Sequence, residues 1–154
     1  MAHLYTATVA WRLGDGEFAK GRYSRAHEWR FDGGIAVPAS ASPQVVPKAY
    51  VDEAAVDPEE AFIASLASCH MLTFLDLARR GGFVVESYED AAEGEMAKNA
   101  AGKYWVSRVT LRPRIAWGGD KQPTHEDLAK LHHVAHEECF IANSVKTEVG
   151  VEGF

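Results

Sequence analysis

The sequence predicts a single α+β domain in which strands flank two central helices. Strand-like alternation marks residues 4–11 and 104–117, and helix-start signals precede two long segments, 57–80 and 124–139. The chain has 154 residues, of which 47% are hydrophobic, which is enough for one sizeable core. We therefore expect one domain over residues 1–154.

Composition argues against two classes of partner. The formal net charge is −6, whereas nucleic-acid grooves and surfaces for anionic membranes need clustered lysine and arginine. Residues 1–5 lack the stages of a secretory signal, so we expect the protein in a reducing cytoplasm. A permanent structural disulfide is disfavoured there.

The N-terminal third is predicted to consist of strands and loops. Residues 4–11 form the first expected strand, followed by a glycine-rich loop at 14–21. The β-prone runs 25–31 and 35–37 are joined by Asp-Gly-Gly, which is typical of a hairpin. Residues 38–55 contain several prolines and no periodicity, which predicts an irregular loop.

The first helix has a well-marked start. Asp57 can act as the N-cap, Pro58 suits the first helical position, and Glu60 completes a capping-box spacing. We expect the helix to run to about Arg79 or Arg80, before a pair of glycines. Polar residues interrupt its apolar stretch, so we interpret it as a buried helix and not a membrane span.

The remaining elements alternate between strands and one helix. Residues 83–86 and 90–96 are predicted strands, and 104–117 is predicted as one long strand with arginines on one face. Thr124 can cap a second helix that continues to Cys139. Residues 145–151 are expected to close the chain as a strand.

Several motifs together resemble the OsmC/Ohr family of thiol peroxidases. They are Asp-Pro-Glu-Glu at 57–60, Cys69 ten positions after Glu59, and Cys139 on a late helix before Asn-Ser. Arg-Ala-His at 25–27 and Cys-His-Met at the first cysteine resemble one branch of that family. The resemblance covers nearly the whole chain and implies an OsmC-like fold, with antiparallel sheets around two central helices in an intertwined homodimer.

The resemblance also implies site residues and partners. Cys69 would be the peroxidatic thiol and Cys139 the resolving thiol, with Glu59 and an N-terminal arginine as supporting groups. The implied activity is thiol-dependent reduction of organic hydroperoxides, with no cofactor and no metal. A dithiol, of lipoyl type in the family, would reopen the disulfide.

The chemistry requires a positive group beside Cys69. An apolar surrounding disfavours a thiolate, and Cys69 lies several turns from the positive end of its helix. Arg25 is the first candidate for that group and Arg22 the second. Because ten helical residues separate Glu59 from Cys69 by roughly 15 Å, we expect a composite site to which a second subunit contributes.

Other interpretations of the same residues remain open. Free cysteine is often inert core, and the chain could be a non-catalytic stress protein that binds a small molecule or a metal. The spacing of His136 and Cys139, together with Cys69 and His70, would allow a zinc site, although paired CxxC motifs are missing. Neighbouring helix positions face apart, so His70 is poorly placed as a base for Cys69. Residues 132 and 133, both histidines, are expected at the surface or the core edge.

Overall fold

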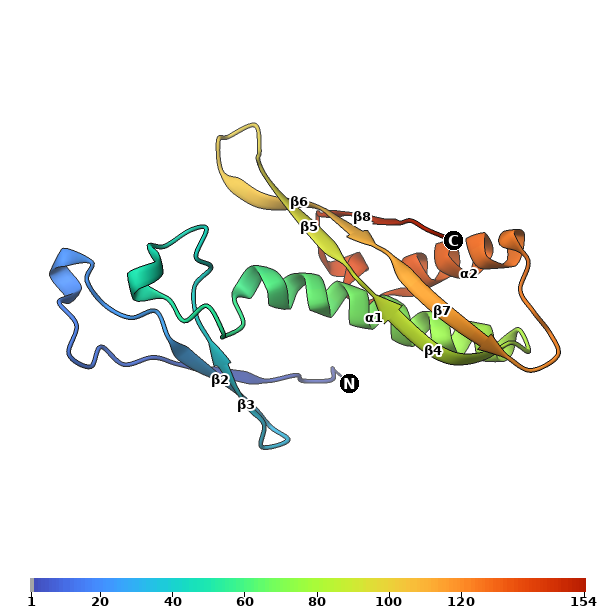
Figure 1. The fold of residues 1–154 in the computed structure, drawn as a ribbon, viewed down its shortest axis with the longest axis horizontal. Coiled ribbons are helices and arrows are strands. Elements are labelled where there is room, and N and C mark those ends of the chain that lie inside the picture. Colours follow the sequence, from blue (N-terminus) through green and yellow to red (C-terminus); the bar gives the residue numbers. More distant parts are fainter. Residues whose placement is uncertain (1) are drawn as a thin grey trace. The chain divides into compact units, whose positions relative to one another are not determined.

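The computed structural model describes residues 2–154 (Figure 1). The chain divides into two compact units, with the boundary between Ala61 and Phe62 in the first turn of a long helix. The expectation that residues 1–154 fold as one domain stays a prediction.

The first unit contains a three-stranded antiparallel sheet in the order β1-β2-β3. Its strands are β1 (Ala7–Ala10), β2 (His27–Phe31) and β3 (Ala36–Ala39), with short 3-10 helices at Phe18–Lys20 and Lys48–Tyr50. The hairpin between β2 and β3 is confirmed, and Gly34 supplies the positive φ of 88° that its turn requires. The first strand is shorter than the predicted 4–11.

Few side chains of the first unit are buried. The fully buried ones lie near the end of β3, at Ala39 and Ser40. Both Val9 and Ile35, by contrast, remain about two-thirds exposed, at 66% and 64%. Strand β1 and the turn before β3 therefore expose apolar side chains that a larger core would cover.

Helix α1 (Pro58–Arg80) has the predicted bounds. The Asp57 carboxylate accepts from the backbone N–H of Glu60 at 2.8 Å, and the Glu60 carboxylate accepts from that of Asp57 at 3.1 Å. These bonds complete the capping box. Gly82, with φ of 79°, follows the last turn in the left-handed conformation that only glycine adopts easily.

The second unit contains two sheets (Figure 1). Strand β4 (Val84–Asp90) pairs with β7 (Pro113–Gly118), whereas β5 (Glu93–Lys98) pairs with β6 (Tyr104–Leu111). The prediction of one strand over 104–117 is wrong, because the run divides at Arg112 between two sheets. Pro113 has no backbone N–H for a ladder, and the N–H of Arg112 donates to the Asp90 carboxylate at 2.7 Å.

The last strand departs from the antiparallel pattern. Strand β8 (Glu148–Val151) pairs with β6 in parallel, so the sheets are not antiparallel throughout. A parallel pair needs a crossover connection, and helix α2 (His125–Glu138) lies in that connection. Thr124 caps α2 as predicted and forms a capping box with Asp127.

The core of the second unit has two parts. One part joins Phe74 and Ala78 of α1 to Ala135 of α2, and β4 and β7 cover it with Tyr88, Ile115 and Trp117. The other joins Leu66 of α1 to Val109 and Leu111 of β6. Helix α1 therefore packs against both sheets, and its buried stripe is Leu66, His70, Phe74 and Ala78.

The expectation that α1 is a buried helix is only partly correct. Beyond that stripe its residues are half-buried or exposed, and Leu72 is 61% exposed. By length and composition alone, α1 could cross a membrane. Core helices of other proteins pass the same test, so this is no argument for a membrane span.

Candidate functional site

The two cysteines come together between α1 and α2. Cys69 lies on α1 next to the buried stripe and is half-buried, whereas Cys139 follows the last turn of α2 and is 1% exposed. Both are free thiols, and they lie close enough for the Cys69 thiol to raise the pKa of the Cys139 thiol. The fold thus brings close together two cysteines that are seventy positions apart in sequence.

The surroundings of Cys139 disfavour its thiolate. Burial raises the pKa of the Cys139 thiol above its ordinary value, and the neighbouring Cys69 thiol raises this pKa further. The backbone N–H of Ala142 donates to the Cys139 sulfur at 3.4 Å and opposes this rise in pKa. Ala142 belongs to the short 3-10 helix Ala142–Ser144, which folds back directly after the cysteine.

Glu59 lies apart from Cys69 on the same helix. It is a half-buried residue in the first turn, where its charge favours the helix N-terminus, and the capping box uses Glu60 instead. Because α1 is continuous between the two residues, ten positions separate them by about 15 Å along the axis. One side chain cannot bridge that distance, as the sequence indicated.

The two candidate arginines have different environments in the first unit. The Arg25 guanidinium stacks over the Tyr23 ring, 3.7 Å from its centroid, and donates to the carbonyls of Gly21 and Tyr23 at 3.1 and 2.6 Å. Arg25 is therefore held in a defined position. Cys69 belongs to the second unit, so a contact between them stays a prediction.

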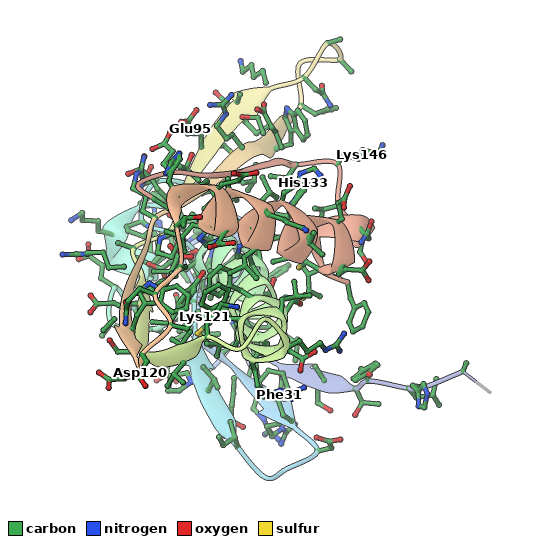
Figure 2. All side chains as sticks on the ribbon, turned by 90° about the vertical axis from the view of Figure 1, so that its right-hand side faces the viewer. Phe31, Glu95, Asp120, Lys121, His133 and Lys146 are labelled. Carbon is green, nitrogen blue, oxygen red and sulfur yellow. The ribbon has the colours of Figure 1, made fainter. Side chains whose placement is uncertain are left out.

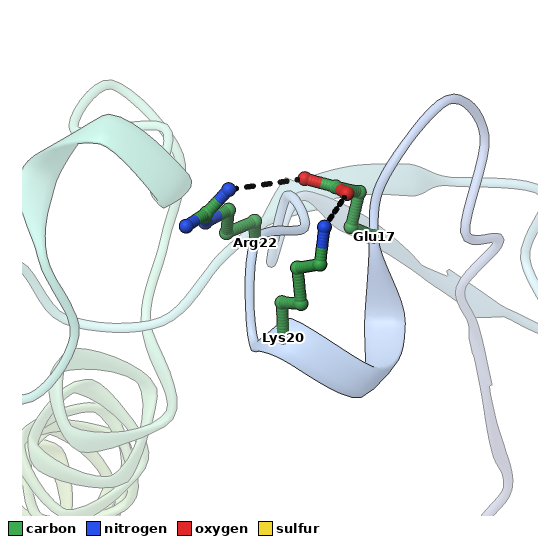
Figure 3. A network of polar contacts seen from close by, with 3 residues as sticks. All are labelled: Glu17, Lys20 and Arg22. Carbon is green, nitrogen blue, oxygen red and sulfur yellow. Dashed lines mark hydrogen bonds and ion pairs between the residues drawn. The ribbon is translucent and has the colours of Figure 1, made fainter.

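Arg22 belongs to an exposed ion-pair network (Figure 3). The Arg22 guanidinium lies 3.4 Å from the Glu17 carboxylate, and the same carboxylate accepts a hydrogen bond from Lys20 at 2.6 Å. Exposed pairs of this kind contribute little to stability. Arg22 thus lies on an ordinary solvated surface, whereas an aromatic ring and two backbone carbonyls hold the Arg25 side chain in place.

Three histidines gather near the cysteines. Nε2 of His70 lies 3.0 Å from Nδ1 of His132, and the rings are almost parallel, at 9°. Burial lowers the pKa of both histidines to about 4, and for His70 the nearby His132 and His136 lower it further. Both imidazoles are therefore neutral at pH 7.

The prediction that His132 lies at the surface or the core edge is wrong, because His132 is 2% exposed and fully buried. His133 is exposed on α2, as predicted (Figure 2). Its Nε2 lies 3.3 Å from the Glu137 carboxylate. The helical spacing of Leu128, His132 and Ala135 could have revealed the buried position, since it places His132 on the apolar face of α2.

Metal-ligand clusters and cavities are two further features that often mark a functional site. Within residues 2–154, no group of three or more His, Cys, Asp or Glu side chains could hold a metal ion. Two surface cavities of about 280 and 310 Å³ lie along β7 and the C-terminal residues, and neither is lined by Cys69.

The sequence matches one protein-family model. That family model, described as OsmC-like protein, matches residues 51–152, which is more than half of the chain. No curated protein matches the chain.

Solved structures with the same fold span the whole chain. An OsmC-like protein of unknown function from Vibrio cholerae is 53% identical, with a TM-score of 0.95 and 98% and 99% of the two chains covered. The organic hydroperoxide resistance protein OhrB of Bacillus subtilis is 22% identical, with a TM-score of 0.67 and coverages of 97% and 98%. A protein described as organic hydroperoxide resistance protein OsmC, from Legionella pneumophila, is 18% identical, with a TM-score of 0.68 and coverages of 99% and 100%.

Proposed function

The chain belongs to the OsmC-like protein family, and we propose that within it this protein is a cysteine-based peroxidase that reduces organic hydroperoxides. The observation that carries the proposal is the meeting of Cys69 and Cys139 between α1 and α2. Two proteins with a similar fold, from Legionella pneumophila and Bacillus subtilis, are organic hydroperoxide resistance proteins, which adds support.

The two thiols differ in a way that suits a division of roles. Cys69 is half-buried and accessible, whereas Cys139 is buried and burial raises its pKa. The thiolate is the nucleophile in peroxide reduction, so Cys69 is the peroxidatic residue and Cys139 the resolving one.

The reaction then proceeds in two steps. The Cys69 thiolate attacks the outer peroxide oxygen, the O–O bond breaks, and the departing alkoxide takes a proton to become the alcohol. The sulfur is oxidised to sulfenic acid and the peroxide is reduced. The Cys139 thiol next attacks the sulfenic sulfur, and a disulfide forms as the hydroxyl leaves as water.

In the proposed mechanism Arg25 and Glu59 activate the Cys69 thiol. A guanidinium stabilises the thiolate and the developing alkoxide, and Glu59 orients that guanidinium. Arg25 suits this role better than Arg22, because its contacts with Tyr23 and two carbonyls hold it in place. Because about 15 Å separates Glu59 from Cys69 on one helix, the proposed site needs groups from two subunits.

A homodimer would supply site groups from a second subunit and would cover apolar side chains that one chain leaves exposed. The first unit buries few side chains, and Leu72 on α1 is 61% exposed. A second copy that covers such apolar surface gains free energy from its burial. Light scattering on purified protein that detected only monomer would contradict this part of the proposal.

The catalytic cycle also needs a reductant. A dithiol such as a lipoyl group would reopen the disulfide by thiol exchange and so complete the turnover. We place the protein in the cytoplasm, where the reducing conditions keep both thiols free between turnovers.

The test compares the wild-type protein with Cys69→Ser. One equivalent of cumene hydroperoxide should remove two hydrogens from the wild-type mass and join residues 69 and 139 in one peptide pair. The serine variant should consume no peroxide. Undiminished peroxide consumption by that variant would end the proposal, and a wild-type pair that stays reduced would favour a small-molecule-binding protein on the same scaffold.

A further inference from the structure

A polar contact interrupts the core of the second unit. Along the buried stripe of α1, His70 stands between Leu66, which belongs to one core cluster, and Phe74, which belongs to the other. Its Nε2 meets Nδ1 of His132 on α2 at 3.0 Å, and the two residues are only 1% and 2% exposed. We call this contact the histidine bond.

The histidine bond is costly for the fold. A neutral imidazole has one donor and one acceptor nitrogen, so the bond satisfies one nitrogen of each ring. The other nitrogens, Nδ1 of His70 and Nε2 of His132, are buried without a partner. Two leucines would fill such a site without leaving polar atoms unsatisfied. An explanation beyond stability is therefore needed.

The rings are also held rigidly. His132 stacks on Phe74, with centroids 4.4 Å apart, and the Phe154 ring lies against it with its centroid at 4.8 Å, tilted by 39°. Stacking of this kind restricts the rotation of the imidazole. An apolar helix contact can slide by small amounts, whereas two clamped rings joined by a directional hydrogen bond accept only one register of the helices.

The position of the bond relates it to the cysteines. On α1 the bond starts at the residue directly after Cys69, which is about 1.5 Å further along the axis. On α2 it lies two turns before Cys139. It thus links the same two helices that carry the two thiols.

Disulfide geometry is sensitive to that register. The Cα atoms of a disulfide usually lie about 4.4–6.8 Å apart, with a narrow range of torsion angles. A slide of one helix by a fraction of a turn would take the sulfur atoms out of that range. We propose that the histidine bond is a positioning contact, which fixes α1 against α2 so that the two sulfur atoms can form a disulfide. The inference rests on the cysteine couple of the proposed function.

The experiment measures the disulfide without peroxide. Wild-type protein and two variants are equilibrated in mixtures of reduced and oxidised dithiothreitol, well below their melting temperatures. The free thiols are then alkylated and counted by mass. His132→Asn places an amide near the position of Nδ1 and can keep the bond, whereas His132→Gln places it near Nε2 and cannot.

The matched pair gives opposite expectations. His132→Gln should lower the equilibrium constant for the disulfide roughly fivefold to tenfold, which is the effect of one lost buried hydrogen bond. His132→Asn should stay within about threefold of the wild type. Equal constants for the two variants, or a wild type that forms no disulfide, would overturn the inference.

A third variant separates positioning from stability. His70→Leu combined with His132→Leu removes the bond and leaves no unsatisfied nitrogen, so the melting temperature should be kept or raised. The disulfide constant should nevertheless fall as in His132→Gln, and a constant within twofold of the wild type would refute positioning. Because dithiothreitol replaces peroxide, the outcome is independent of whether the protein reduces hydroperoxides.

Discussion

Acid should destabilise this protein through its two buried histidines. Burial lowers the pKa of His70 and of His132 from 6.5 to about 4. Between these values the unfolded chain binds protons that the folded chain does not. The stability that the neutral pair contributes is therefore complete above pH 6.5 and is lost progressively as the pH falls toward 4.

The size of the effect follows from the same values. For one histidine whose pKa is lowered from 6.5 to about 4, the free energy of unfolding is about 2 kcal/mol smaller at pH 5 than at pH 7.5. Two independent histidines would give about 4 kcal/mol. Repulsion between two charged rings lowers the second pKa further and does not reduce this loss, so we expect about 4 kcal/mol for the pair.

Other titratable groups surround the pair. His136 faces His70 from α2, Tyr88 of β4 contacts Phe74, and His125 stacks on Phe154 beside His132. Asp90 on β4 has a pKa raised by burial, so its contribution to the pH dependence has the opposite sign. Variants that keep these groups are the proper controls.

The assay is urea unfolding followed by circular dichroism at pH 7.5 and pH 5, at one fixed protein concentration. His133→Asn, which changes an exposed histidine, should keep the full pH dependence. The double leucine variant at positions 70 and 132 should lose most of it. A wild-type free energy of unfolding that changes by less than about 0.5 kcal/mol would refute the reasoning.

Three further outcomes test the fold and the cysteine couple. Cys139→Ser should still form sulfenic acid at Cys69 with one equivalent of peroxide, detectable with a dimedone probe, whereas the wild type should form the disulfide and label weakly; equal dimedone labelling of the two proteins would contradict the resolving role. Asp57→Ala removes one half of the α1 capping box and should lower the free energy of unfolding by about 1 kcal/mol in the same urea assay. Phe74→Ala empties a fully buried position and should cost about 3–5 kcal/mol, so a loss below about 1 kcal/mol would mean that the core described around α1 is incorrect.

Local signals account for the elements that the sequence predicted well. Asp57, Pro58 and Glu60 fixed the start of α1, and Thr124 fixed that of α2, because capping uses backbone groups only three residues away. The Asp-Gly-Gly turn predicted the hairpin for the same reason. The two cysteines were found as a candidate couple through motifs and not through geometry.

Contacts between distant segments required the tertiary structure. Pro113 and the bond from Arg112 to Asp90 divide what alternation alone shows as one strand, and β8 joins β6 in parallel across a helix. Burial of His132 depends on which face of α2 meets α1. These outcomes follow from pairings over tens of residues, and no local preference encodes them.

By itself, therefore, the sequence determined the two helices, their ends and the hairpin, since each depends on hydrogen bonds between near neighbours. The approach of Cys69 to Cys139 and the buried bond of His70 to His132 were decided only by the packing of α1 against α2. Packing sums many weak contacts between remote segments, so it selects a register that neither helix specifies alone.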